Sequence, residues 1–297
     1  MPQPVSLSNH RRGVIFVLIA AALWSTSGLL VRIICADEPT IIFWRSVSAS
    51  VFLGLYILHS HKGSLRSMLR GLGWPGLMVA SLLSVDAVIS VFALAHTHVA
   101  NVMLIFSMTP FIAGVIAWCW LRESVLRATW VAMTLCVVGV VIMVSGSIGT
   151  SLLLGDGLAF IVVFIFATSV VAIRRYPTID LIVAVWVSSM LGVVMSWPFA
   201  TPFGHGTQDY ALMAIFGALE YALALLLFTI GAWHIPAAQS TLIGLLEVVL
   251  SPIWVWLAIN EVPQEPTLIG GTLILITLVI YALHDTRSGG KRQAVVG

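Results

Sequence analysis

The stretch STLIGLLEVVLSPIWVWL, from Ser240 to Leu257, decides how this chain folds. It approaches the roughly 20 mostly apolar residues that a helix needs to cross a bilayer, yet it contains one carboxylate, Glu247. Two interpretations fit such a stretch. It is either a buried helix of a soluble protein in which Glu247 pairs locally, or a membrane span whose acid faces the inside of a helix bundle.

The composition of the whole chain selects the membrane span. Of the 297 residues, 60% are hydrophobic and 9% are charged, and the mean hydropathy is +1.06. A soluble globular protein is about 25% charged, so no soluble fold of this length could bury so much apolar surface. We therefore expect an all-α polytopic membrane protein. The three cysteines lie in or beside apolar segments and predict neither a disulfide framework nor a metal site.

Turn-forming residues and short loops divide the chain into ten apolar segments, which leaves no room for a domain outside the membrane. The expected spans are 14–34, 39–58, 74–95, 99–121, 128–146, 156–173, 180–199, 209–232, 236–259 and 267–284.

The basic residues predict the orientation, because they concentrate on the cytoplasmic side of membrane proteins. With a cytoplasmic N-terminus, all Lys and Arg except Arg32 and Arg45 fall at the cytoplasmic ends of the spans or in the cytoplasmic loops and tail. We expect a protein of the cell (inner) membrane with both termini in the cytoplasm.

The two halves of the chain repeat each other. A shift of 142 residues aligns Trp44 with Trp186, and a shift of 138 aligns Glu123 with Glu261. Each half has five spans, an odd number, so the second copy crosses the membrane in the opposite direction. This arrangement is typical of alternating-access carriers, which bind substrate between the copies near the midplane. We expect a first repeat at 1–146, a second at 151–285 and a cytoplasmic basic tail at 286–297.

These repeats resemble the EamA-type family of the drug/metabolite transporter superfamily. The likeness is carried by TPFIAGVIAWCWLRE, beginning at Thr109, and LEVVLSPIWVWLAINE, beginning at Leu246; LWSTSGLLVR and FWR resemble the family's opening helices. The resemblance implies that helices one to four and six to nine surround a central cavity, with helices five and ten outside it. The chain departs from the family at Val248, where the second repeat commonly has proline.

Three carboxylates are candidates for the pathway because acids inside a membrane nearly always face a bundle interior or a cavity. Glu247 is about halfway along its span and shares a small polar stripe with Ser251. Asp86 and Glu220 are central in the third and eighth spans, and the repeat places them on the same face of equivalent helices. Each acid could exchange a proton for substrate or could instead form only structural hydrogen bonds, with Tyr221 a candidate beside Glu220.

Other candidates lie on the second, first and sixth helices. Arg45 could bind a substrate carboxylate in a bidentate fork, or its side chain could extend outward to Asp37 or Glu38. Trp24 and Ser27 share one face of the first helix, and Thr168 is among their counterparts in the sixth. These three residues suit an amphiphilic ligand, but ordinary packing through small residues explains them equally well.

The function we expect is secondary transport of small organic metabolites such as amino acids or amphiphilic drugs, most simply export, with protons as a possible coupling ion. The protein would be a monomer or homodimer. We expect no enzyme, cofactor, metal or nucleic-acid partner. GLGWPG (Gly71–Gly76) fits a dinucleotide-binding pattern but follows no strand. Alternatives are a sugar-phosphate or nucleotide-sugar antiporter, which needs more cavity bases than Arg45 alone, and a channel or receptor.

Overall fold

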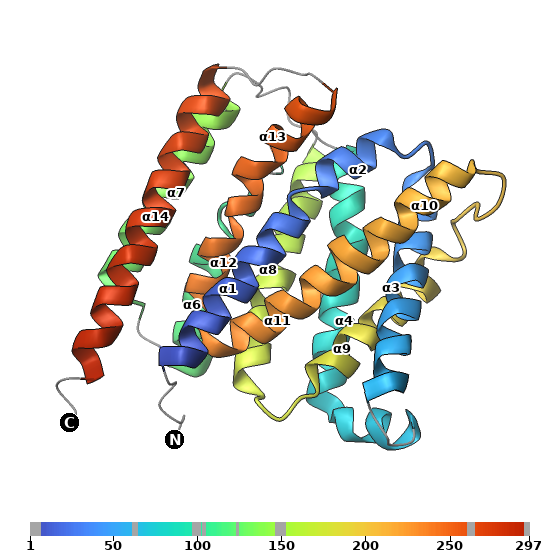
Figure 1. Ribbon diagram of the computed structural model, residues 1–297, viewed down its shortest axis with the longest axis horizontal. Helices are drawn as coiled ribbons and strands as arrows, with labels where there is room; N and C mark the ends of the chain where they lie inside the picture. The colour runs from blue at the N-terminus through green and yellow to red at the C-terminus, as the bar shows by residue number, and fades with distance from the viewer. Residues whose placement is uncertain are drawn as a thin grey trace.

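The computed structural model describes residues 7–60, 65–96, 102, 105–122, 125–145, 153–259 and 265–293. All regular secondary structure in these residues is helical. The helices form one bundle, and the helix that begins at Leu7 starts at the end of the bundle where the helix that ends at Gln293 finishes (Figure 1).

The helices of the first half follow the expected spans closely except near the fourth. They are α1 (Leu7–Trp24), α2 (Ser27–Ile33), α3 (Glu38–Ser60), α4 (Leu65–His96), α6 (Thr109–Leu121) and α7 (Arg127–Val144). The beginning of the expected fourth span, 99–121, falls partly outside the described residues. Together α1 and α2 cover the first expected span.

The second half begins with α8 and has two spans that are built from several pieces. Its helices are α8 (Leu153–Arg175), α9 (Leu181–Ser196), α10 (Thr207–Ile215), the π-helix η1 (Phe216–Leu223), α11 (Ala224–His234), α12 (Ala237–Gly244), α13 (Leu246–Ile259) and α14 (Glu265–Gln293). The run α10–η1–α11 is the expected eighth span, and α12–α13 is the ninth.

Length and hydropathy confirm a helical protein with several membrane spans. Within the described residues, six helical runs are long and apolar enough to cross a bilayer. The runs are Asn9–Val31, Glu38–His59, Gly71–Ala93, Leu154–Arg175, Thr207–His234 and Ala237–Ala258. The other four expected spans coincide with shorter apolar helices, namely Thr109–Leu121, Arg127–Ile142, Leu181–Ser196 and Leu268–Tyr281.

Local chemistry explains where the helices bend. Gly73 has φ 61°, a left-handed conformation that favours glycine, and it separates the first turns of α4 from the part that begins at Trp74. The bond between Thr26 Oγ1 and the Leu23 carbonyl (2.7 Å) accompanies the break between α1 and α2. At Leu245 the amide bonds to the Leu242 carbonyl, three residues back, and this tighter turn separates α12 from α13.

Helices α7 and α14 pack side by side along one edge of the bundle (Figure 1). Gly139 allows this approach, because a Cβ there would lie 3.0 Å from the Gly270 carbonyl oxygen and 2.7 Å from Ile274 Cγ1. The Thr129 and Tyr281 hydroxyls are hydrogen-bonded at 3.0 Å. These are helices five and ten of the expected order, and they lie beside the other helices rather than among them.

Candidate functional site

Arg45, in the middle of α3, is enclosed by neighbouring helices rather than extended toward the surface. Its side chain is 6% exposed, and Nη2 donates a hydrogen bond to the Ala87 carbonyl of α4 at 3.0 Å. The guanidinium carbon lies 4.7 Å from the centre of the Tyr221 ring and 5.3 Å from that of Phe216. This position is incompatible with an outward extension to Asp37 or Glu38.

The π-helix η1 explains how two rings reach the same guanidinium. Phe216 and Tyr221 are five residues apart, and in an α-helix such residues point about 140° away from each other. A π-turn instead joins residues five apart by hydrogen bonds, so the two rings fall on nearly the same face. Cation–π contacts of this kind stabilise a desolvated arginine by about 2 kcal/mol, and here they hold the guanidinium in one place.

Gly217 sets the distance between η1 and α3. A Cβ at this position would overlap the Arg45 carbonyl oxygen and would lie 2.7 Å from Ser48 Cβ. Because the clash is with backbone, it could not be relieved by turning a side chain. Any other residue at 217 would push the two helices apart and move the rings away from Arg45.

Asp86 and Glu220 bring two carboxylates to the region of Arg45. Asp86 precedes Ala87, which accepts the Arg45 bond, and Glu220 precedes Tyr221. The charge of Arg45 acts on both acids. Asp86 Oδ1, Glu220 Oε2, Arg45 Nε and Tyr221 Oη are buried and have no hydrogen-bond partner within the described chain. We call Arg45, Asp86, Phe216, Glu220 and Tyr221 the Arg45 cluster.

Glu247 approaches this cluster from another helix. It is half-buried in the first turn of α13, directly after the break at Leu245. The positive end of a helix dipole stabilises an acid at such a position. The charge of Glu247 acts on both Asp86 and Glu220.

Trp24, Ser27 and Ser251 lie near the breaks in the first and ninth spans. The half-buried Trp24 packs against Phe228 (ring centres 4.9 Å apart) and Phe166 (5.9 Å). Ser251 lies against the α2 backbone, because a Cβ on Gly28 would be 2.9 Å from its hydroxyl. Ser27, next to Gly28, is half-buried.

Thr168 is not brought to the Arg45 cluster by any described contact. Its hydroxyl donates to the Phe164 carbonyl of its own helix at 2.7 Å, and Phe164 is exposed. Its neighbour Ser169 is fully buried and also bonds within α8, to Phe166. Of Thr168 and Ser169, only Ser169 therefore points into the bundle.

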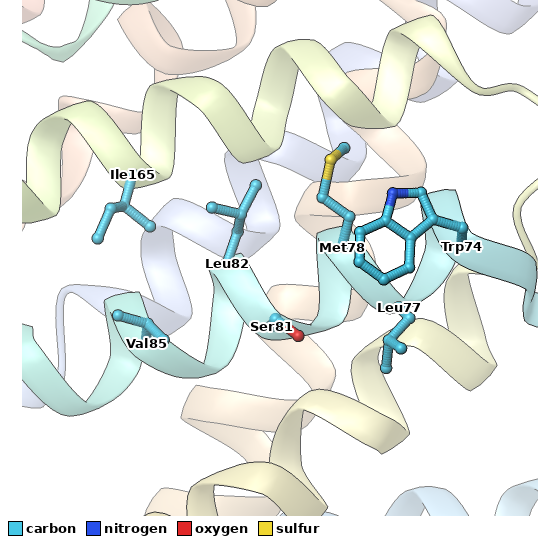
Figure 2. A pocket seen from close by; sticks show the side chains of 7 residues that line it. All are labelled: Trp74, Leu77, Met78, Ser81, Leu82, Val85 and Ile165. Atoms are coloured by element: carbon cyan, nitrogen blue, oxygen red, sulfur yellow. The ribbon is translucent and has the colours of Figure 1, made fainter.

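Two mostly apolar hollows of the described surface lie beside α4. One, of about 400 Å³, is lined by six α4 side chains and by Ile165 of α8; Figure 2 shows these side chains around it. The second, also of about 400 Å³, shares Trp74 and Leu77 with the first. Neither is lined by an acid or by Arg45, so they are separate from the candidate site.

Three residues near the site were missed from the sequence. Phe216 was missed because it and Tyr221 would lie on different faces of an ordinary α-helix. Gly217 could have been noticed in the sequence, because it lies three residues before Glu220, an acid inside a predicted span. Trp254 donates from Nε1 to Ser25 Oγ at 2.7 Å and so joins the ninth span to the first.

Several membrane-spanning helices around a charged interior define a membrane transport protein. The family model for the EamA-like transporter family matches residues 11–145 and 153–283. The chain therefore belongs to this family, as its motifs indicated, and it is a transporter rather than an enzyme.

Curated relatives extend this assignment at low identity. The pseudopaline exporter CntI of Pseudomonas aeruginosa is 24% identical over 94% of this chain and 98% of its own length. The uncharacterized transporter YwfM of Bacillus subtilis is 22% identical over 90% of this chain and 93% of its own. A solved crystal structure superposes with a TM-score of 0.78 at 18% identity, covering 91% of this chain and 97% of the other, which shows a shared fold.

Proposed function

We propose that this protein is a secondary transporter that exports small organic metabolites, such as amino acids or amphiphilic drugs, by alternating access. The observation that carries the proposal is the Arg45 cluster. A buried polar atom without a partner costs about 1–3 kcal/mol, so four such atoms, from two acids, one base and one tyrosine, require a purpose other than stability. A polar solute that passes through the bundle provides one. The name of the Pseudomonas aeruginosa relative supports export as the direction.

The proposed mechanism depends on two inverted repeats, at 1–146 and 151–285, followed by a basic tail at 286–297. If α1–α2, α3, α4, α6 and α7 correspond in order to α8, α9, α10–η1–α11, α12–α13 and α14, the helix contacts form matched pairs. In the first matched pair, α4 contacts α8, and its counterpart α11 contacts α1. In the second, α4 contacts α9, and its counterpart η1 contacts α3. This pattern supports a two-fold relation about which the copies could rock.

The proposed orientation places both termini in the cytoplasm, and the position of the start of α1 and the end of α14 at one end of the bundle supports it (Figure 1). Cys35 follows α2 and is exposed, so in this orientation it lies outside the cell. A membrane-impermeant maleimide applied to intact cells should label the protein, and Cys35→Ser should remove that label. Labelling only after the cells are opened would contradict the orientation.

We further propose that transport is coupled to protons through Glu247, Asp86 or Glu220. Purified protein in liposomes would be tested by counterflow, which needs no gradient, and by accumulation driven by a pH gradient. We expect Glu247→Gln to retain counterflow and to lose the gradient-driven accumulation. Unchanged accumulation in this variant, together with an unchanged pH dependence, would exclude Glu247 from coupling.

The alternative function within the fold is antiport of sugar phosphates or nucleotide sugars. A phosphate dianion needs several cations, and the Arg45 cluster has one guanidinium for two carboxylates. This charge balance favours the metabolite exporter. A channel would show flux that does not saturate with solute concentration, which the same liposomes would reveal.

A further inference from the structure

The two apolar hollows beside α4 lie on either side of one exposed ridge of that helix. Trp74 and Leu77 line both hollows, and they are 77% and 41% exposed. Ile165 of α8 completes the first hollow, and Val187 of α9 completes the second. In Figure 2, Ile165 extends from α8 toward α4, whereas Leu77 points to the other side of α4. The ridge therefore separates two neighbouring hollows on the outside of the bundle.

The first hollow has about the length of one bilayer leaflet. It follows α4 from Trp74 to Val85, which is about 16 Å along a helix and half of a hydrocarbon core of about 30 Å. Trp74 directly follows the bend at Gly73, near the start of the span Gly71–Ala93. In the proposed orientation this is the cytoplasmic end of the span, where tryptophan is enriched. The hollow thus extends from the cytoplasmic interface to the middle of the bilayer.

Hydrocarbon chains suit both hollows better than water does. Apart from the Trp74 indole, Ser81 is the only lining residue with a polar side chain. Water in such a place would lack hydrogen-bond partners, and an empty hollow would lose dispersion contacts. Because the two hollows share Trp74 and Leu77, they match the two acyl chains that diverge from the glycerol of one phospholipid.

A described cation lies at the cytoplasmic end of the first hollow. Ala93 of α4 belongs to the same buried cluster as Ala159 of α8, and Val79 belongs to the same cluster as Ile173. The two helices are therefore antiparallel, and α8 ends where the α4 span begins. Arg175, two residues after Ile173, is exposed. Its guanidinium is thus placed at the level of a lipid headgroup.

The sequence around the bend of α4 adds charge of the same sign. No acid occurs between Glu38 and Asp86, whereas Arg66 and Arg70 lie one helical turn apart in the first part of α4. At the start of α9, Asp180 contributes one acid, whose Oδ1 accepts hydrogen bonds from two amides of its own helix. Bases thus outnumber acids here. Basic pockets between helices on the cytoplasmic side bind anionic lipid headgroups.

We propose that α4 carries a binding site for an anionic diacyl phospholipid of the cytoplasmic leaflet. One acyl chain lies in each hollow, and the phosphate lies beside Arg175 and the basic first part of α4. Arginine suits this role because its guanidinium pairs with phosphate in a bidentate fork. The site is separate from the Arg45 cluster, and the inference uses only the orientation from the proposed function.

The test measures lipid binding to the purified, delipidated full-length protein by native mass spectrometry. Three probes are compared: phosphatidylglycerol, phosphatidylcholine with the same two chains, and lysophosphatidylglycerol with one chain. We expect phosphatidylglycerol to bind about tenfold more tightly than either of the others. Phosphatidylcholine lacks the net negative charge, and the lysolipid can fill only one hollow.

A substitution in the first hollow tests the position of the chains. Ser81→Phe would fill this hollow, so the affinity for phosphatidylglycerol should fall to that for the lysolipid. Thr134→Phe is the matched control, because Thr134 is a small hydroxyl residue on the exposed surface of α7. The control should leave all three affinities unchanged.

A second pair of variants tests the charge. In the Arg70→Gln, Arg175→Gln double variant, the affinity for phosphatidylglycerol should fall about tenfold, to that for phosphatidylcholine, whose own binding should not change. Arg127→Gln is the control, since Arg127 is an exposed base at the start of α7. This pair also decides the question if Ser81→Phe does not fold.

Several outcomes overturn the proposal. Equal affinities for phosphatidylglycerol and phosphatidylcholine would mean ordinary annular lipid only. Equal losses in a variant and its control would remove the assignment to α4, and tight binding of the lysolipid would reject the use of two hollows. A dimer that excludes lipid and disappears in Ser81→Phe would assign the hollows to a second copy of the chain. The expected pattern without counterflow in liposomes would retain this site and reject the transport function.

Discussion

The Arg45 cluster and the α7–α14 pair both lie in a tightly packed helix bundle, but they differ in whether their buried polar atoms are hydrogen-bonded. Between α7 and α14, the Thr129 and Tyr281 hydroxyls bond to each other across the interface. None of the buried, unpartnered side-chain atoms found in the described residues belongs to these two helices, whereas Arg45, Asp86 and Glu220 each have one. The α7–α14 contact pairs these hydroxyls within the chain, while the Arg45 cluster keeps polar atoms that have no partner among the described residues.

Gly217→Ala should give the largest effect on stability. The added methyl group would overlap the backbone of α3, and overpacking of this kind costs about 3 kcal/mol. We expect a lower melting temperature in detergent and, in the surviving folded protein, slower counterflow in liposomes. Gly157→Ala is the control, since nothing lies within 4 Å of a Cβ there. Equal stability of the two variants would mean that η1 is not held against α3.

Gly139→Ala should destabilise less, by about 1 kcal/mol, although it also adds a methyl group at a close helix contact. The nearest atom to the new Cβ is Ile274 Cγ1 at 2.7 Å, and a side chain can turn away. The backbone neighbour, the Gly270 carbonyl oxygen, is at 3.0 Å, which requires a smaller shift than the overlap at Gly217. Counterflow by the folded fraction should be unchanged, because α7 and α14 contribute no residue to the Arg45 cluster. A loss of counterflow as large as in Gly217→Ala would show that the two regions do not differ in function.

Thr129→Val removes the hydroxyl that bonds to Tyr281 and keeps the shape of the side chain. Hydrogen bonds between membrane helices contribute about 0.6 kcal/mol on average, so we expect a small decrease in melting temperature. A double-mutant cycle with Tyr281→Phe would isolate the energy of the pair. Additive effects of the two substitutions would show that the bond contributes no coupling energy.

Asp37→Asn should have the smallest effect, and the effect should depend on pH. Partial burial alone would raise the pKa of Asp37, but hydrogen bonds from Thr40 and Thr201 outweigh it and the pKa lies below its ordinary value. Stability from the ionised carboxylate is therefore fully present above the unfolded pKa of about 3.9 and is lost as the pH falls through the folded pKa. Unfolding of the two proteins would be compared between pH 3 and 7, with convergence expected at the acid end.

Much of the fold could be predicted from sequence because a bilayer leaves few alternatives. Backbone polar groups must be satisfied within the segment, so an apolar run of sufficient length predicts a helix. The expected span 39–58 corresponds to α3, and 180–199 corresponds to α9, with differences of a few residues. Trp74, expected to open the third span, directly follows the bend at Gly73.

The site was harder to predict because its geometry depends on interruptions that hydropathy does not encode. Spacing on an ideal helix found Glu247 and Asp86, but it could not predict a π-helix at Phe216 or a tightened turn at Leu245. Helix register is set by hydrogen-bond partners, and apolar side chains specify it weakly. The aromatic neighbours of Arg45 followed from that register and so became visible only in the structure.

The corner between α2 and α3 is fastened to the corner between α9 and α10 by bonds that water can replace. Thr201 Oγ1 donates to Asp37 Oδ1 at 2.8 Å, and the Cys35 amide donates to Asp209 Oδ1 at 3.1 Å; both bonds are exposed. Exposed bonds of this kind exchange for solvent at little net cost. Separation of these corners would therefore be opposed less by the loops than by the buried contact between α3 and α9, where Ser50 Oγ donates to Ser189 Oγ at 3.0 Å.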